Sequence, residues 1–303
     1  MTKFTLGINT YFAVKRWPEP EEWARIVSKD LGLSTAQFDL DLLDPNTLEP
    51  YRGIQAANIR QACEKHGVRV QSTLTGGVGY HMSLLLHPDP GMRVCALDWF
   101  QKAVTLSAEL KADGTGGPLG ALSMRDFADR KRREHHEACL KDALHSLGAY
   151  AKTHGLKYLI WEPSPVRREL PATISDAERL YEFVNDGAPL PVIYLFDVGH
   201  VCNFEGSAQD KDPYQWIKRI GKWCPIIHLQ QTDGTGDHHW PFTKEFNKVG
   251  IIDAKKVLDA VEGAGINEVY LELEIIHAFE ANESKVLDDL KETVEHWQKA
   301  LSR

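Results

Sequence analysis

The sequence predicts an α/β protein built as a (β/α)₈ barrel, and two observations lead to this fold class. Short β-type runs alternate along the 303-residue chain with longer segments whose apolar residues recur at helical spacing. The starts of the β-type runs are about 30 to 45 residues apart, as expected when a parallel strand returns through a helical crossover. Since barrels of this length routinely form one domain, we expect residues 1–303 to be a single TIM-barrel domain.

Eight segments have the composition of strands. They are rich in β-branched and aromatic residues and are bounded by glycine, proline or other turn formers. They cover residues 4–11, 35–43, 68–77, 111–117, 156–163, 191–200, 225–234 and 268–276. The fourth is short and contains several glycines. Eight is the number of parallel strands that closes a TIM barrel.

Helical spacing of apolar residues appears between these strands and after the last one. It is clearest over residues 54–66, 94–110, 135–154, 177–185, 254–264 and 285–300. As crossover helices, these segments would cover the outside of the barrel. No linker, low-complexity tract or block of like charge divides the chain, which favours a single domain.

Composition excludes several classes of protein. Acidic residues outnumber basic ones by 43 to 35, and the net charge of −8 disfavours a nucleic-acid surface. No apolar stretch approaches the ~18 residues of a membrane span, and no secretory signal is visible, so we expect a cytoplasmic protein without membrane contact. The five cysteines are scattered and never spaced CxxC, which argues against a disulfide framework and a thiolate zinc site.

Polar residues stand where the chemistry of such a barrel is found, at the carboxyl ends of the strands. The predicted strand ends carry Glu162, Asp197, His228, Glu272 and Glu274. Side chains alternate between the two faces of a strand, so Glu272 and Glu274 share a face. Glu274 is nearer to the carboxyl end, and we therefore expect it to be the functional one of the two.

Several carboxylates converging on one barrel mouth would repel each other and resist burial unless a cation lay between them. The candidate set is rich in oxygen, contains one imidazole and has no thiolate. Such a set suits Mn²⁺ or Mg²⁺, with Co²⁺ as an alternative, and does not suit a tetrahedral structural zinc ion.

Three further residues are candidates for contacts with a substrate. His87, after the third strand, is placed to meet a distal hydroxyl or phosphate, although its HPDP segment is also a common start of a helix. Arg168, after the fifth strand, could bind an anionic group or pair with a surface acid, and the sequence does not distinguish it from Arg167. Trp240 lies with His238 and His239 in a long loop after the seventh strand. These residues could form a second metal cluster, but we expect this loop to act as a lid with an apolar wall.

Four motifs carry a resemblance to a known family. They are WEP at 161–163, FDVGH at 196–200, IIHLQQTDG at 226–234 and LELEIIHAFE at 271–280. With them the chain resembles the xylose isomerase-like TIM-barrel superfamily of sugar isomerases and epimerases, and most of all its ketose 3-epimerase branch. The resemblance implies that the metal ligands are Glu162, Asp197, His228 and Glu274. It also implies that Glu162 and Glu274 act as acid and base and that His200 lies beside the site.

The function implied is that of a metal-dependent epimerase acting on a short ketose or a ketose phosphate such as erythrulose phosphate. One carboxyl group would remove the proton at C3, and the other would return it on the opposite face. An aldose/ketose isomerase and a keto-inositol-type dehydratase remain open alternatives, as does a non-enzymatic sugar-binding barrel. An abasic-site endonuclease is disfavoured, since it would need more histidines and a basic groove. Relatives in this superfamily are often homo-oligomers, but the sequence reveals no self-complementary surface.

Overall fold

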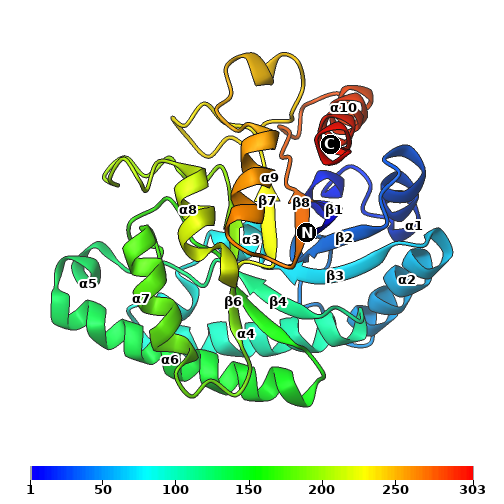
Figure 1. Ribbon diagram of the computed structural model, residues 1–303. Helices are drawn as coiled ribbons and strands as arrows, with labels where there is room; N and C mark the ends of the chain where they lie inside the picture. The colour runs from blue at the N-terminus through cyan, green and yellow to red at the C-terminus, as the bar shows by residue number, and fades with distance from the viewer. Residues whose placement is uncertain (1, 303) are drawn as a thin grey trace.

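Across residues 2–302, which the computed structural model describes, eight parallel strands close into a barrel in chain order. They are β1 (Lys3–Asn9), β2 (Thr35–Asp39), β3 (Arg69–Leu74), β4 (Gly114–Gly117), β5 (Tyr158–Trp161), β6 (Val192–Asp197), β7 (Ile226–Leu229) and β8 (Glu268–Leu273). The ring is completed by β8, which pairs with β1 over six residue pairs from Lys3 and Glu268 to Ile8 and Leu273. Figure 1 shows the strands gathered at the centre of the molecule. The predicted TIM-barrel fold is confirmed.

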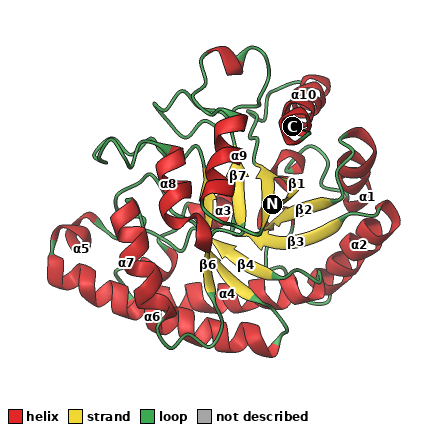
Figure 2. Cartoon of the chain, viewed as in Figure 1, coloured by secondary structure: helices red, strands yellow, loops and turns green. Residues whose placement is uncertain are grey.

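The helices lie around the barrel, as the contrast of red helices and yellow strands in Figure 2 makes clear. They are α1 (Pro20–Arg25), α2 (Tyr51–His66), α3 (Gly76–Tyr80), α4 (Pro90–Glu109), α5 (Met124–Ala128), α6 (Arg130–Thr153), α7 (Ile174–Asn185), α8 (Pro213–Ile220), α9 (Ala254–Gly263) and α10 (Glu283–Leu301). All six predicted helices are present. Some begin earlier than predicted because a polar cap sets their first residue. The Asp89 side chain accepts from the Met92 amide at the start of α4, for example, and Asp129 accepts from Arg132 at the start of α6.

All eight predicted strands are present, but most end earlier than their apolar run. The predicted strand 35–43 stops at Asp39, because the Asp39 carboxylate accepts from the Asp41 amide and turns the chain. The glycine-rich fourth strand has a steric reason for its composition. A Cβ atom on Gly116 would lie 2.0 Å from the carbonyl oxygen of Ile160 on β5, so only glycine allows this pair of strands to approach.

The barrel interior has its own small apolar cluster, separate from the large core between the strands and the helices. Leu74, Ile160, Leu195 and Ile226 form it. Side chains two residues apart on a strand point to the same face. The residues that follow three members of this cluster at that spacing are Glu162, Asp197 and His228. The fold therefore directs these polar side chains toward the barrel axis, one layer above the apolar floor.

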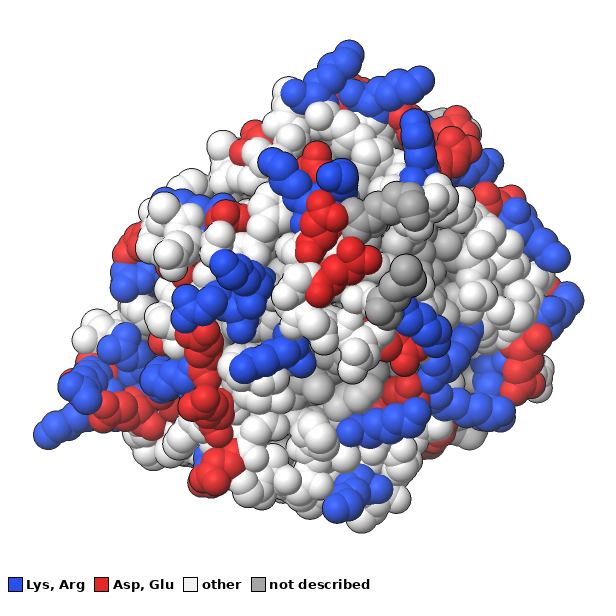
Figure 3. Space-filling view, in the orientation of Figure 1, with Lys and Arg blue, Asp and Glu red and all other residues white. Residues whose placement is uncertain are grey.

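The outer surface carries both signs of charge. On the face shown in Figure 3, blue basic and red acidic side chains are interspersed over the helices. Many of them are paired, as Arg219 is with Glu178 at 2.6 Å and Arg25 with Asp30 at 3.0 Å. Within residues 2–302, none of the helices combines the length and the apolar character that a membrane crossing requires.

Candidate active site

Four side chains at the carboxyl end of the barrel form a buried cluster. Glu162 directly follows β5, Asp197 ends β6, His228 lies in β7 and Glu274 directly follows β8. One ligand atom of each lies within 4.8 Å of the others. The Nδ1 atom of His228 is 2.9 Å from Oε2 of Glu274, 3.5 Å from Oε1 of Glu162 and 3.9 Å from Oδ2 of Asp197. All four residues are buried, and none is more than 6% exposed.

A chain of hydrogen bonds orients the imidazole of His228. Its Nε2 atom lies 2.6 Å from Oε1 of Gln37, and the amide nitrogen of Gln37 donates to the hydroxyl of Ser72 at 3.0 Å. Because the Gln37 oxygen can only accept, Nε2 carries a hydrogen atom, and Nδ1 is the ring atom that faces the carboxylates and is available to a proton or a metal ion. Asn9 extends the chain by donating to both Gln37 (3.1 Å) and Glu274 (3.3 Å). Partners of this kind commonly fix the ligand histidines of metal sites.

The cluster concentrates negative charge. Burial raises the pKa of Asp197. Burial alone would lower the pKa of His228, but the adjacent carboxylates of Glu274 and Glu162 hold it well above its ordinary value. The protein thus favours positive charge at the centre of the cluster.

The same centre fits a divalent cation. The buried Nδ1 atom of His228 makes no well-formed hydrogen bond, although three carboxylates surround it. Oxygen ligands about 2.0–2.2 Å from one ion lie ~3 Å apart when adjacent and ~4 Å apart when opposite, which matches the separations around His228. Three carboxylates and one imidazole suit Mn²⁺ or Mg²⁺ by their hardness.

A cavity of about 240 Å³ opens over the cluster. Glu162 and Glu274 reach it, and its walls come from strand ends and loops all around the barrel mouth. The wall residues that carry hydrogen-bonding groups are Tyr11, Asp39, Tyr80, His81, His200, Asp237 and His239. No lysine or arginine is among the residues found to line this cavity. Its size is below the range of ~300–1,000 Å³ typical of drug-sized ligands, so it suits a small polar molecule.

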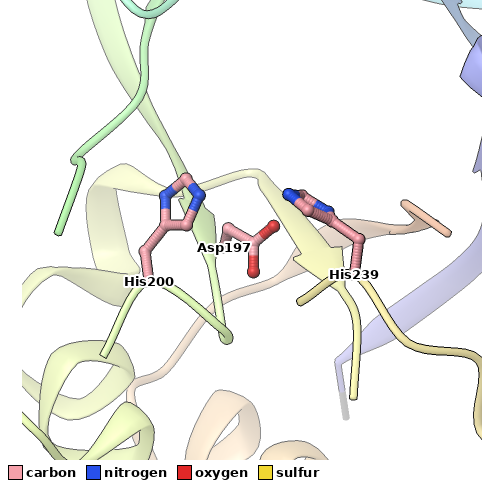
Figure 4. Close-up of side chains that lie close together, drawn as sticks. All are labelled: Asp197, His200 and His239. Carbon is pink, nitrogen blue, oxygen red and sulfur yellow. The ribbon is translucent and has the colours of Figure 1, made fainter. Parts of the chain in front are cut away.

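A second group of metal-type side chains lies at the wall of this cavity. Asp197 sits between His200 and His239, which come from the loops after β6 and β7 (Figure 4). The two imidazoles, however, are already engaged. Nε2 of His200 is 3.3 Å and Nε2 of His239 is 3.2 Å from the two carboxylate oxygens of Asp237, and Nδ1 of His200 lies 2.8 Å from the carbonyl oxygen of Pro163. The first cluster is therefore the better candidate for holding a cation.

The pKa values of the two histidines also distinguish the second group from the first. Burial acts to lower the pKa of His239, but the Asp237 carboxylate outweighs it and raises the pKa to about 9. Burial likewise acts to lower the pKa of His200, and Asp237 and Asp197 raise it well above its ordinary value. Asp237 thus favours the protonated form of both imidazoles beside the carboxylate cluster.

The predicted substrate contacts divide into those near the cavity and those away from it. His200 lines the cavity. Arg168 lies in an adjoining cavity, which shares Tyr80 and Asp237 with the first. Its Nη1 atom donates to the Leu122 carbonyl at 3.2 Å, and its charge acts to lower the pKa of the neighbouring Glu169 carboxyl.

The other two predicted contacts lie elsewhere. His87 lines a separate cavity, and its Nδ1 atom accepts from the Asp89 amide before α4, so the HPDP segment does start a helix. Trp240 stacks on His238 at 4.1 Å and on Phe246 at 5.0 Å, within the loop after β7. It is not among the residues found to line the main cavity, where His239 takes that place. Where this loop lines the cavity it contributes the polar residues Asp237 and His239, and not the apolar wall expected from the sequence.

Glu272, the second glutamate of the eighth strand, lies below the cluster. It is wholly buried, and neither carboxyl oxygen makes a well-formed hydrogen bond within residues 2–302, although Gln71 is near enough to act on its pKa. A Cβ atom on Gly7 would lie 2.3 Å from its carboxyl, so glycine makes room for this group on the neighbouring strand β1. Burial raises the pKa of Glu272 to about 7.

Replacing Glu272 by glutamine is expected to flatten the dependence of stability on pH. A carboxyl whose pKa is near 4.5 in the unfolded chain and about 7 in the folded one stabilises the fold below pH 4.5, and that stability is lost as pH rises to about 7. The difference corresponds to about 3 kcal/mol. Urea unfolding of chelator-treated protein at pH 5 and pH 8 should therefore show a larger drop for the wild type than for Glu272→Gln. If the free energy of unfolding dropped equally in the two proteins, the Glu272 carboxyl would lie in a more polar environment than the structure indicates.

The chain is similar to a known protein family and to a relative with a named activity. The family model described as "Xylose isomerase-like TIM barrel" matches residues 27–300. The D-erythrulose 1-phosphate 3-epimerase of Brucella abortus (strain 2308) is 30% identical to the chain, with 97% of this chain and 95% of that protein covered.

Two solved structures share the architecture of this chain and differ in how similar they are to it. A Rhodospirillum rubrum protein, provisionally named a xylose isomerase, superimposes with a TM-score of 0.91 at 31% identity, covering 98% of this chain and 99% of the other. D-psicose 3-epimerase of Clostridium cellulolyticum H10, solved with D-tagatose, has a TM-score of 0.67 at 15% identity, covering 98% and 97%. At 15% identity, the similarity to D-psicose 3-epimerase shows a shared fold.

Proposed function

The chain belongs to the xylose isomerase-like TIM barrel family, and we propose that it is a divalent-metal-dependent epimerase that inverts C3 of a short ketose phosphate. It is an enzyme of the sugar isomerase and epimerase class. The observation that carries the finer proposal is the cluster of Glu162, Asp197, His228 and Glu274, in which two glutamates approach one candidate cation position from strands three places apart in the ring. We take residues 1–303 to act as one domain.

Glu162, Asp197, His228 and Glu274 would hold the ion, with Mn²⁺ or Mg²⁺ as the preferred metal. When bound, the ion supplies electrostatic stabilisation of the negative charge that develops on the adjacent ketone and hydroxyl oxygens of the substrate. Gln37 and Asn9 keep His228 and Glu274 in place through the hydrogen bonds described above.

Glu162 and Glu274 carry the proton steps. Both line the cavity and are buried, so a substrate there would meet them without much intervening water. One carboxylate removes the proton from C3, which leaves the enediolate, and the other carboxyl returns a proton on the opposite face. His200 and His239 line the cavity beside them, where Asp237 holds both imidazoles in place.

A phosphorylated substrate is supported by two observations. The relative that is 30% identical is named for D-erythrulose 1-phosphate. In addition, Arg168 lies in an adjoining cavity, and Tyr80 and Asp237 line both cavities. The main cavity, lined by no lysine or arginine among the residues found there, would take the ketose, and Arg168 would bind the phosphate.

Arg168→Met is expected to lower kcat/KM for a ketose 1-phosphate by about 10- to 100-fold, mainly through KM, because a charged hydrogen bond of ~1.5–3 kcal/mol is lost. The unphosphorylated ketose should be turned over as by the wild type. Arg167→Met is the matched control, since Arg167 is paired with Glu205 and should matter less than about threefold. An equal loss on both substrates would remove Arg168 from phosphate binding.

The reaction itself can be identified by NMR. Tetruloses and pentuloses, each with and without phosphate, are incubated with the Mn²⁺-loaded protein in deuterium oxide. Deuterium at C3 with inversion is the expected result for a ketose phosphate. Deuterium at C1 with formation of an aldehyde would indicate an aldose/ketose isomerase, and loss of water would indicate a dehydratase. If no ketose exchanges, the proposed function is wrong.

A further inference from the structure

Gln230, which directly follows β7, uses both hydrogens and the oxygen of its side-chain amide between the ion cluster and the loop after β7. Its side chain is wholly buried. The Nε2 atom donates to Oδ2 of Asp197 at 3.1 Å and to Oδ1 of Asp237 at 2.6 Å. The Oε1 atom accepts from the backbone amide of His239 at 2.5 Å. One amide group therefore connects a candidate metal ligand with two residues of the cavity wall.

The backbone beside Gln230 is shaped to receive this side chain. A Cβ atom on Gly199 would lie 2.3 Å from Cδ of Gln230, so the amide group lies flat against the chain after β6. The amide of Gly199 also donates to Oδ1 of Asp197 at 2.6 Å. Both oxygens of the Asp197 carboxylate thus have a donor, one from Gly199 and one from Gln230.

The neighbouring residue, Gln231, provides an internal comparison. It is equally buried, and its Oε1 atom accepts from the backbone amides of Thr232 and Ile252 at 3.1 and 3.0 Å. Its Nε2 atom donates to Asn247 at 2.9 Å and to the Ile252 carbonyl at 3.0 Å. Gln231 therefore anchors the same loop, but its hydrogen bonds reach none of the four candidate ligands.

We propose that Gln230 is a positioning residue that couples ion binding at Asp197 to the order of the loop 232–242. The two hydrogens of one amide can be satisfied together only when Asp197 and Asp237 are both in place, so fixing either carboxylate favours the other. An ion that holds Asp197 would stabilise the loop residues Asp237 and His239 at the cavity wall, and by linkage an ordered loop would strengthen ion binding. This inference rests on the ion site of the proposed function.

The first test compares Gln230→Met with Gln231→Met, two substitutions that keep the side-chain volume and remove the amide. Mn²⁺ affinity is measured by electron paramagnetic resonance or calorimetry. Gln230→Met is expected to bind Mn²⁺ about 10- to 100-fold more weakly than the wild type, as is usual when a partner of a metal ligand is lost. Gln231→Met should stay within about threefold. Unchanged affinity in Gln230→Met, or an equal loss in both variants, would overturn the inference.

The second test uses the wild-type protein and therefore does not depend on how the variants fold. Hydrogen exchange is measured with and without Mn²⁺ at the amide of His239, which donates to Gln230, and at the amide of Ile252, which donates to Gln231. Mn²⁺ is expected to slow exchange at His239 by about fivefold or more and to leave Ile252 unchanged. Equal effects at the two amides would contradict the coupling. A wild-type protein that binds no divalent ion would instead contradict the proposed function.

Discussion

Glu162→Gln and Glu274→Gln are each expected to slow solvent-deuterium exchange at C3 by at least about 10³-fold while the barrel stays folded. Each glutamine keeps the size of the side chain and an oxygen that can still contact an ion, but it cannot take up or return a proton at neutral pH. Loss of a general acid or base typically costs 10²–10⁴-fold, and weaker ion binding would add to that loss.

The matched control for these variants is Glu272→Gln. It makes the same replacement two residues before Glu274, at a side chain of β8 that is not among those lining the cavity. It should retain exchange within about tenfold of the wild type. Exchange is followed by NMR, Mn²⁺ affinity is measured in parallel, and circular dichroism reports the fold. Wild-type exchange in Glu162→Gln or Glu274→Gln would exclude that residue from the proton steps.

Removal of the ion is expected to have an effect of similar size. Chelation should abolish exchange, and added Mn²⁺ should restore it to the wild type but not to His228→Ala. That substitution removes the only imidazole of the cluster and leaves the Gln37 oxygen without its closest donor. Without this imidazole, no positively charged side chain would offset the charge of the three carboxylates, and they would repel each other more strongly.

His238→Ala is the control for the histidine substitution. His238 lies in the loop after β7, where it contacts Asp233 and stacks on Trp240, and it is not part of either cluster. Activity of His238→Ala should return with Mn²⁺ as it does in the wild type. Exchange that survives exhaustive chelation, or that returns in His228→Ala, would show that the reaction proceeds without an ion at this cluster.

The fold could be predicted because its signals are periodic. Parallel barrel strands appear in the sequence as short apolar runs. In each crossover helix, apolar residues recur with a period of about 3.6 residues. Strand ends were predicted too long, since buried residues such as Leu40 continue the apolar pattern into turns at the barrel mouth. The helix starts depended on caps such as Asp89, which apolar spacing does not reveal.

Three of the four clustered residues could be predicted for a geometric reason. Glu162, Asp197 and His228 follow apolar interior residues at a spacing of two, and in a barrel all such positions converge on one axis. Asp39 ends β2 and reaches the same cavity, so the signal that singled out Glu162 was present there also.

The loop residues could not be predicted in this way. Asp237 and His239 lie in a loop without periodicity, and only the tertiary fold brings them beside Asp197 and His200. The same limit explains Trp240, whose side chain packs within its own loop. Gln230 is one of two adjacent glutamines, and the chain alone does not show which of them faces the cluster.

The most direct test of the account is a crystal structure of the Mn²⁺-loaded protein with anomalous data collected at the manganese edge. One strong anomalous peak is expected, coordinated by carboxylate oxygens of Glu162, Asp197 and Glu274 and by Nδ1 of His228. A peak held by Asp197, His200 and His239 instead, or no peak at the barrel mouth of a protein that is catalytically active, would contradict it.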